Sequence, residues 1–154
     1  MLEVESLLEN YAAGPQLLRA AVDGLNATEF DAVPIAEKWS IRQVVCHLAD
    51  FEAVNAERMK RILSSDNPTL FDADPDDFVT SLSYQHRDIE EELSLISITV
   101  SQMFRILSNC DIEDFQRTGA HSEDGPLTLE SLIERTTNHI PHHIAFIEEK
   151  RKAL

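Results

Sequence analysis

Histidines are the residues of this chain best suited to metal or acid–base chemistry, and three of the six lie within five positions in NHIPHHIAF. His139 and His143 are four residues apart, which on a helix places them on one face, one turn apart. At 100° per residue, His139 and His143 both lie closer than His142 to the apolar stripe of their helix, and His142 points to solvent. This spacing is typical of metal ligands, although two histidines four residues apart also occur together by chance.

His47 occupies a comparable position on an earlier helix, flanked one turn on each side by Val44 and Phe51. Two helices can therefore present imidazoles toward one cleft, which is where helix bundles build metal sites. His47, His139 and His143 are candidate ligands for Zn, Ni, Co or Fe, with a position left for water or substrate. Metal affinity should fall as the pH drops through ~6.5, where histidines become protonated. The alternative is three histidines at the edge of the core with no metal.

Other candidate residues are weaker. His86 falls on the apolar stripe of its predicted helix. It is interpreted either as a core residue or as an acid or base that lines a pocket. Glu52 borders the apolar stripe of its helix. It is interpreted either as a proton acceptor or as a half-solvated glutamate with no such role. Cys46 adjoins His47 but points away from the apolar stripe, so we interpret it as incidental. His121 is expected to be exposed in a polar loop.

The elements that position these residues are helical, since no segment alternates as a β-strand does. The apolar spacing predicts four amphipathic helices, and thus an all-α four-helix bundle, over 3–23, 40–64, 75–108 and from Thr128 onward. Gly14-Pro15 should bend or divide the first helix. Pro141 lies between two of the histidines, and we expect a kink there, because the apolar stripe continues in register beyond it.

Capping signals support these boundaries. Ser40 and Gln43 have the spacing of a capping box, and Thr128 is the expected cap of the last helix. Acidic residues around Pro75 predict the start of the third helix, after a linker over 64–77. A polar connection over 109–127 leads to the last helix.

Composition excludes several classes of partner. At 154 residues the chain is expected to form a single domain, 1–154. Its net charge of −15 disfavours nucleic acid and anionic membranes. No apolar run has the ~20 residues of a membrane helix, and the N-terminus is acidic where a secretion signal is basic. With only two cysteines, the sequence predicts a cytoplasmic protein.

Two stretches carry a resemblance that covers nearly the whole chain: EKWSIRQVVCHLADFE, and RTGAHSEDGPLTLESLIERTTNHIPHHIAFI. In their order and motifs they resemble the DinB/YfiT-like family. The resemblance implies a four-helix bundle with one histidine ligand from the second helix and two from the fourth, which match His47, His139 and His143. It also implies a metal-dependent enzyme and a homodimer, and characterised relatives include transferases of low-molecular-weight thiols.

The sequence and the resemblance together predict a divalent-metal-binding protein that acts on a small molecule. Transfer of a low-molecular-weight thiol is favoured over hydrolysis. One alternative is a non-catalytic metal- or ligand-binding bundle, and another is a purely structural dimer. Pro141 departs from the family's last motif and bears on the geometry of the two late histidines.

Overall fold

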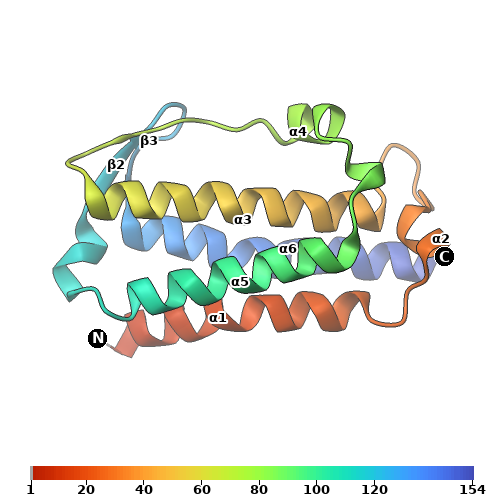
Figure 1. Cartoon of the computed structure of the whole chain (residues 1–154), viewed down its shortest axis with the longest axis horizontal. Coiled ribbons are helices and arrows are strands. Elements are labelled where there is room, and N and C mark those ends of the chain that lie inside the picture. Colours follow the sequence, from red (N-terminus) through yellow and green to blue (C-terminus); the bar gives the residue numbers. More distant parts are fainter. Residues whose placement is uncertain (1) are drawn as a thin grey trace.

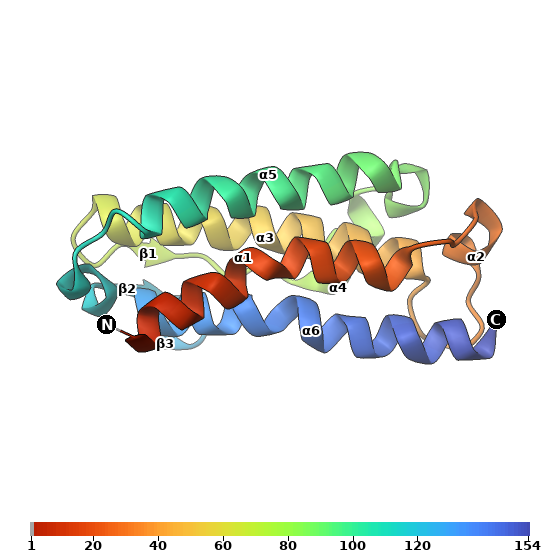
Figure 2. The same ribbon diagram turned by 90° about the horizontal axis from the view of Figure 1, so that it is seen from below.

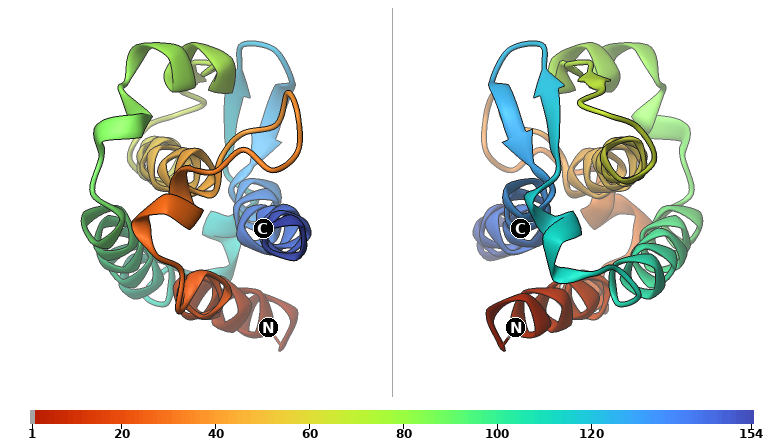
Figure 3. Two further views of the ribbon diagram at one scale, coloured as in Figure 1. Left: turned by 90° about the vertical axis from the view of Figure 1, so that its right-hand side faces the viewer. Right: turned by 90° about the vertical axis from the view of Figure 1, so that its left-hand side faces the viewer.

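The computed structural model describes residues 2–154, and four long helices form its body. These helices are α1 (Leu2–Val22), α3 (Ile41–Ser64), α5 (Ile89–Leu107) and α6 (Leu129–Ala153). α1 and α3 each pack against both α5 and α6, so α1 and α3 occupy opposite corners of the bundle (Figures 2 and 3). The predicted all-α four-helix bundle is thereby confirmed. No helix in the described part of the chain is long and apolar enough to span a bilayer.

Helix direction sets the topology. In Figure 1, α1 and α6 run one way and α3 and α5 run the other. Because α3 and α5 are consecutive and parallel, the chain must return along the bundle between them. α3 has 24 residues, which corresponds to about 36 Å. The crossover over 65–88 covers this length and includes β1 (Thr69–Leu70), α4 (Pro75–Ser81) and the 3₁₀ helix η1 (Tyr84–His86).

The predicted single helix over 75–108 is wrong, because the crossover divides it. Its start is as expected, with Asp74 capping α4 and Pro75 in the first turn. The chain then leaves the helix after Ser81, and Ser83 adopts a left-handed conformation with φ 52°. A new cap at Asp88 begins α5. The apolar residues had helical spacing throughout, but Leu82 is 43% exposed and lies between α4 and α5.

Arg87 anchors the end of the crossover to the bundle. Its guanidinium donates to both carboxylate oxygens of Asp50 on α3, at 2.7 and 2.9 Å, and also to Glu92 on α5. All three side chains are largely withdrawn from solvent. Such bidentate pairs are among the stronger side-chain interactions, so the crossover is held against both helices that it connects.

A small three-stranded sheet contradicts the expectation of no strands. β2 (Thr118–His121) pairs with β1 in parallel and with β3 (Gly125–Thr128) antiparallel, in the order β1-β2-β3. Strands of two to four residues are too short to show alternation in the sequence. A Cβ at Gly119 would lie 2.8 Å from Leu70, so glycine permits the close approach of β2 to β1. Figure 3 shows the hairpin and crossover on the side of α3 and α6.

The remaining boundaries agree with the capping signals. Ser40 and Gln43 form the capping box of α3, and Thr128 accepts a hydrogen bond from the Ser131 N–H at the start of α6. Both Pro15 and Pro141 lie inside continuous helices, so neither divides its helix. Two short elements join the long helices at opposite ends of the bundle, α2 (Ala27–Asp31) and the 3₁₀ helix η2 (Ile112–Gln116).

Candidate metal centre

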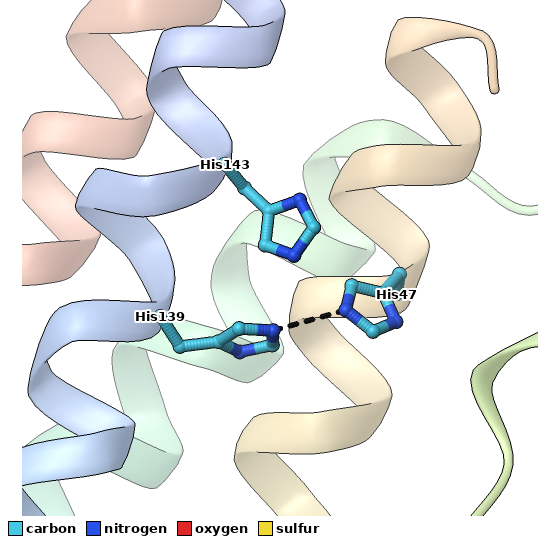
Figure 4. Close-up of side chains that lie close together, drawn as sticks. All are labelled: His47, His139 and His143. Carbon is cyan, nitrogen blue, oxygen red and sulfur yellow. Dashed lines mark hydrogen bonds between the residues drawn. The ribbon is translucent and has the colours of Figure 1, made fainter. Parts of the chain in front are cut away.

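The three histidines singled out from the sequence meet between α3 and α6 (Figure 4). His47 lies in the second turn of α3, and His139 and His143 lie one turn apart on α6. One ring nitrogen of each lies within 4.8 Å of the other two. The Nε2 atoms of His47 and His139 are 3.0 Å apart. Because α6 continues through Pro141, the four-residue spacing is preserved.

The closest pair of nitrogens has nearly the spacing of two ligands in a tetrahedral metal site. Zn–N bonds of ~2.0–2.1 Å in tetrahedral geometry place ligand nitrogens about 3.3 Å apart, close to the separation seen between His47 and His139. The Nδ1 atoms of His47 and His143 are buried and have no hydrogen-bond partner among the described residues. The nitrogens that meet between His47 and His139 are the Nε2 atoms. The convergence of one nitrogen from each of three rings is therefore the feature that resembles a set of metal ligands.

Burial keeps these imidazoles neutral, which is the form that binds metal. Desolvation, reinforced by the neighbouring His139, lowers the pKa of His47 to about 4. The pKa of His139 is lowered to about 4 by desolvation and by His142, and burial followed by the other histidines lowers that of His143 to about 3. Protons therefore compete with metal only near pH 4, well below the pH of ~6.5 expected from unperturbed histidines.

Aromatic rings surround the cluster and make it partly apolar. The His47 ring lies 4.5 Å from the Phe51 ring and 5.1 Å from Trp39, between centroids. Phe51 in turn contacts Phe78 on α4, which brings the crossover to the site. On α6, Phe146 lies 5.6 Å from His143. Such walls restrict water and strengthen electrostatic interactions at the centre.

The other sequence candidates lie elsewhere. His86 is exposed in η1 and is not on an apolar helix face, contrary to expectation. Glu52 is 3% exposed rather than half solvated, and accepts a hydrogen bond from the Tyr11 hydroxyl on α1. Cys46 was expected to point away from the apolar stripe of its helix, but it is fully buried, because its thiol is directed at the Tyr84 carbonyl of η1 at 3.7 Å. Burial raises the pKa of that thiol to about 12, so it is a poor ligand and agrees with an incidental cysteine.

His121 was expected to be exposed and is instead 7% exposed. It ends β2, and the hairpin folds back over it, so that its Nδ1 accepts hydrogen bonds from the backbone N–H groups of Glu123 and Asp124. The sequence could not show this because the strands that bury it were not predicted.

Two cavities adjoin the cluster on different sides. One, of about 180 Å³, is lined by His143 and by Trp39, Phe146, Lys38 and Lys150. The other, of about 190 Å³, is lined by His139 and, among others, Arg58 and Arg135.

The sequence analysis missed Arg58 and Arg135, although their spacing from the candidate ligands could be read from the sequence. Arg58 follows His47 by eleven residues, or three helical turns, and Arg135 precedes His139 by one turn. Each arginine therefore lies on the same helix face as its histidine.

Comparison with known proteins places the chain in a family. Residues 10–147 match the DinB superfamily. The chain belongs to the DinB superfamily. A protein of Oceanobacillus iheyensis is 31% identical over 140 residues, covering 90% of this chain and 81% of the relative. One from Bacillus licheniformis is 26% identical and covers 99% of this chain and 87% of its own length. Each is named "Putative metal-dependent hydrolase".

The fold has a close solved counterpart in YfiT from Bacillus subtilis. The TM-score is 0.91 at 24% sequence identity, with 97% of this chain and 86% of YfiT covered. The YfiT structure is described as that of a probable metal-dependent hydrolase with an unusual four-helix bundle topology. At this sequence identity, the similarity between the two structures supports the fold of this chain, including the parallel arrangement of α3 and α5.

Proposed function

We propose that this DinB-superfamily protein is a metal-dependent enzyme whose ligands are His47, His139 and His143. One observation carries the proposal: three imidazoles held neutral by burial converge from two helices beside open cavities. The relatives are named as metal-dependent hydrolases, which supports the presence of a metal. Zn, Ni, Co and Fe all suit such a nitrogen donor set.

The small-molecule reaction that we propose is transfer of a thiol to an electrophile. When bound, a divalent metal would supply Lewis acidity that lowers the pKa of a thiol or water ligand. A free thiol has a pKa of ~8.5 and water one of ~15.7, so the thiol requires less help to ionise. Hydrolysis also uses a general base that accepts the proton of the attacking water, and this base is a histidine or a carboxylate in many enzymes. Within residues 2–154 the cluster contains histidines alone, and Glu52 is engaged by Tyr11.

Hydrolysis is the second candidate, favoured by the names of the relatives. An assay on untagged protein, with the metal content measured by elemental analysis, separates the two. Protein loaded with each metal is offered a low-molecular-weight thiol with a haloalkane or epoxide, and separately a panel of esters and amides. We expect metal-dependent loss of free thiol that His47→Ala abolishes. Metal-dependent ester or amide cleavage without thiol consumption would replace transfer by hydrolysis, and bound metal with neither activity would indicate a non-catalytic binding bundle.

Association into a homodimer is part of the same proposal. Leu95 and Ile98 lie one turn apart on α5 and are 42% and 68% exposed, an apolar surface suited to a second copy. Light scattering on the purified protein gives the mass directly, and a monomer at micromolar concentration would exclude a stable dimer. The cytoplasmic location remains a prediction from the sequence.

A further inference from the structure

The cavity beside His139 is built by three separate parts of the chain. α3 contributes Asn55 and Arg58, the β2–β3 hairpin contributes His121 and Asp124, and α6 contributes Arg135. Phe51, Leu127 and Leu132 complete the wall. At about 190 Å³ the cavity has room for several non-hydrogen atoms, since a water molecule occupies ~30 Å³. The sheet that the sequence did not predict therefore forms one wall of a space next to the histidine cluster.

Arg58 is an unusual residue to find in this wall. It is 8% exposed, and no carboxylate among the described residues lies within ion-pair distance of it. Its guanidinium donates to the Phe71 carbonyl at 2.5 Å and to the Asn55 Oδ1 at 3.2 Å, and its Nε has no partner in the described part of the chain. A buried charge is costly unless it is paired. In a chain of net charge −15, this cation is conspicuous.

The polar neighbours of Arg58 present donors to the same cavity. Asn55 uses its Oδ1 as an acceptor for Arg58, and its Nδ2 donates to no other group among the described residues. His121 accepts two backbone hydrogen bonds at Nδ1, so its hydrogen is on Nε2. That Nε2 lies 3.9 Å from the Asp72 carboxylate, beyond hydrogen-bond distance. Two donors and a guanidinium thus line one space.

One anionic side chain also lines the cavity, and it is already paired. Asp124 contacts Arg135 at 2.7 Å, and this hydrogen bond lowers the pKa of the Asp124 carboxyl. The pair carries no net charge. Among the residues that line the cavity, the net charge is therefore the positive charge of Arg58. The exposed Asp72, which is not part of this wall, is a further anion close to both Arg58 and His121.

We propose that this cavity is an anion subsite, in which Arg58, Asn55 and His121 bind a carboxylate or phosphate group of the substrate. The inference rests on the proposed function, because His139 joins the subsite to the metal ligands. Such a subsite limits the substrates to small anionic molecules. In these molecules the anionic group and the reacting atom are separated by about the distance from the subsite to the metal ligands. A planar guanidinium with free donors suits either oxyanion.

The test uses a series of hydroxamates, which bind active-site metals, carrying a tail of two to four methylenes. The tail ends in a carboxylate, a phosphonate or a methyl group. Calorimetry on the zinc-loaded protein should show at least one anionic member binding about tenfold more tightly than its methyl counterpart, and the two anionic tails distinguish carboxylate from phosphate recognition. Equal affinities for all three ends at every length would overturn the proposal.

Matched variants sharpen this result. Asn55→Asp keeps the acceptor for Arg58 but replaces the free donor by a negative oxygen, so the preference for anions should disappear. Asn10→Asp makes the same change of charge at an exposed position on α1 and should retain it. Circular dichroism checks that both variants fold. Retention of the preference by Asn55→Asp would exclude the subsite.

A second measurement separates this inference from the proposed function. Inorganic phosphate is titrated into metal-free protein while the Arg58 Nε–H resonance is followed by NMR. We expect a saturable shift in the wild type and in Asn10→Asp, but not in Asn55→Asp. If phosphate shifts the resonance but the protein binds neither zinc nor the hydroxamates, the subsite is supported and the metal enzyme is refuted. Absence of the shift in the wild type would refute the subsite, whatever the metal does.

Discussion

Glu52 gives a sharp test of the buried electrostatics in this bundle. It is 3% exposed, and burial raises its pKa to about 7 from the ordinary 4.5, although the Tyr11 hydroxyl acts in the opposite direction. Between these two values the folded protein binds a proton that the unfolded chain has released. The free energy of unfolding must therefore decrease as the pH rises through this window. At ~1.4 kcal/mol per pH unit, the loss between pH 5 and pH 8 is about 2–3 kcal/mol.

The assay is urea unfolding followed by circular dichroism at pH 5 and pH 8, on protein freed of metal by a chelator. Other carboxyls also titrate, so each wild-type value is compared with that of Glu52→Gln at the same pH. Gln cannot ionise, so the free energy of unfolding of the variant, relative to that of the wild type, should increase by about 2–3 kcal/mol from pH 5 to pH 8. This increase is the gain expected from removing the Glu52 carboxyl. Glu148→Gln, an exposed control on α6, should show no such gain. A gain below about 0.5 kcal/mol for Glu52→Gln would refute the reasoning.

Three further predictions concern the metal. His47→Ala, His139→Ala and His143→Ala should each remove stoichiometric metal, whereas His142→Ala should not, because His142 is exposed; elemental analysis checks this, and metal loss in His142→Ala alone would reassign the ligands. Metal affinity, measured by calorimetry, should change little from pH 8 to pH 5 and fall steeply toward pH 4, because pKa values of about 3 to 4 keep the ligands neutral until then; a steep fall near pH 6.5 would mean unperturbed imidazoles. Chelation should leave a folded helical protein by circular dichroism, since the apolar core between the helices exists without the metal; loss of most helical signal would make the metal structural.

The two helices that carry the candidate ligands, α3 and α6, could be predicted from local features of the sequence. The capping box at Ser40 and the cap at Thr128 are local interactions between residues three apart, so they could be located without a structure. The direction of the three histidines follows from helix geometry and from the apolar stripe, which are equally local. α6 continues through Pro141, as expected from an apolar stripe that continues in register beyond it, while the kink at this residue stays a prediction.

Features that depend on contacts between residues distant in sequence could not be predicted in this way. The parallel arrangement of α3 and α5 requires the chain to return along the bundle, and this divides a segment whose apolar spacing is helical. β1 and β2 are about 50 residues apart, so their pairing leaves no local pattern. Their sheet buries His121 and brings it to Arg58 beside His139. Burial also sets the low pKa values of the histidine cluster and the raised pKa of Glu52, because desolvation depends on what packs around a group and not on its neighbours along the chain.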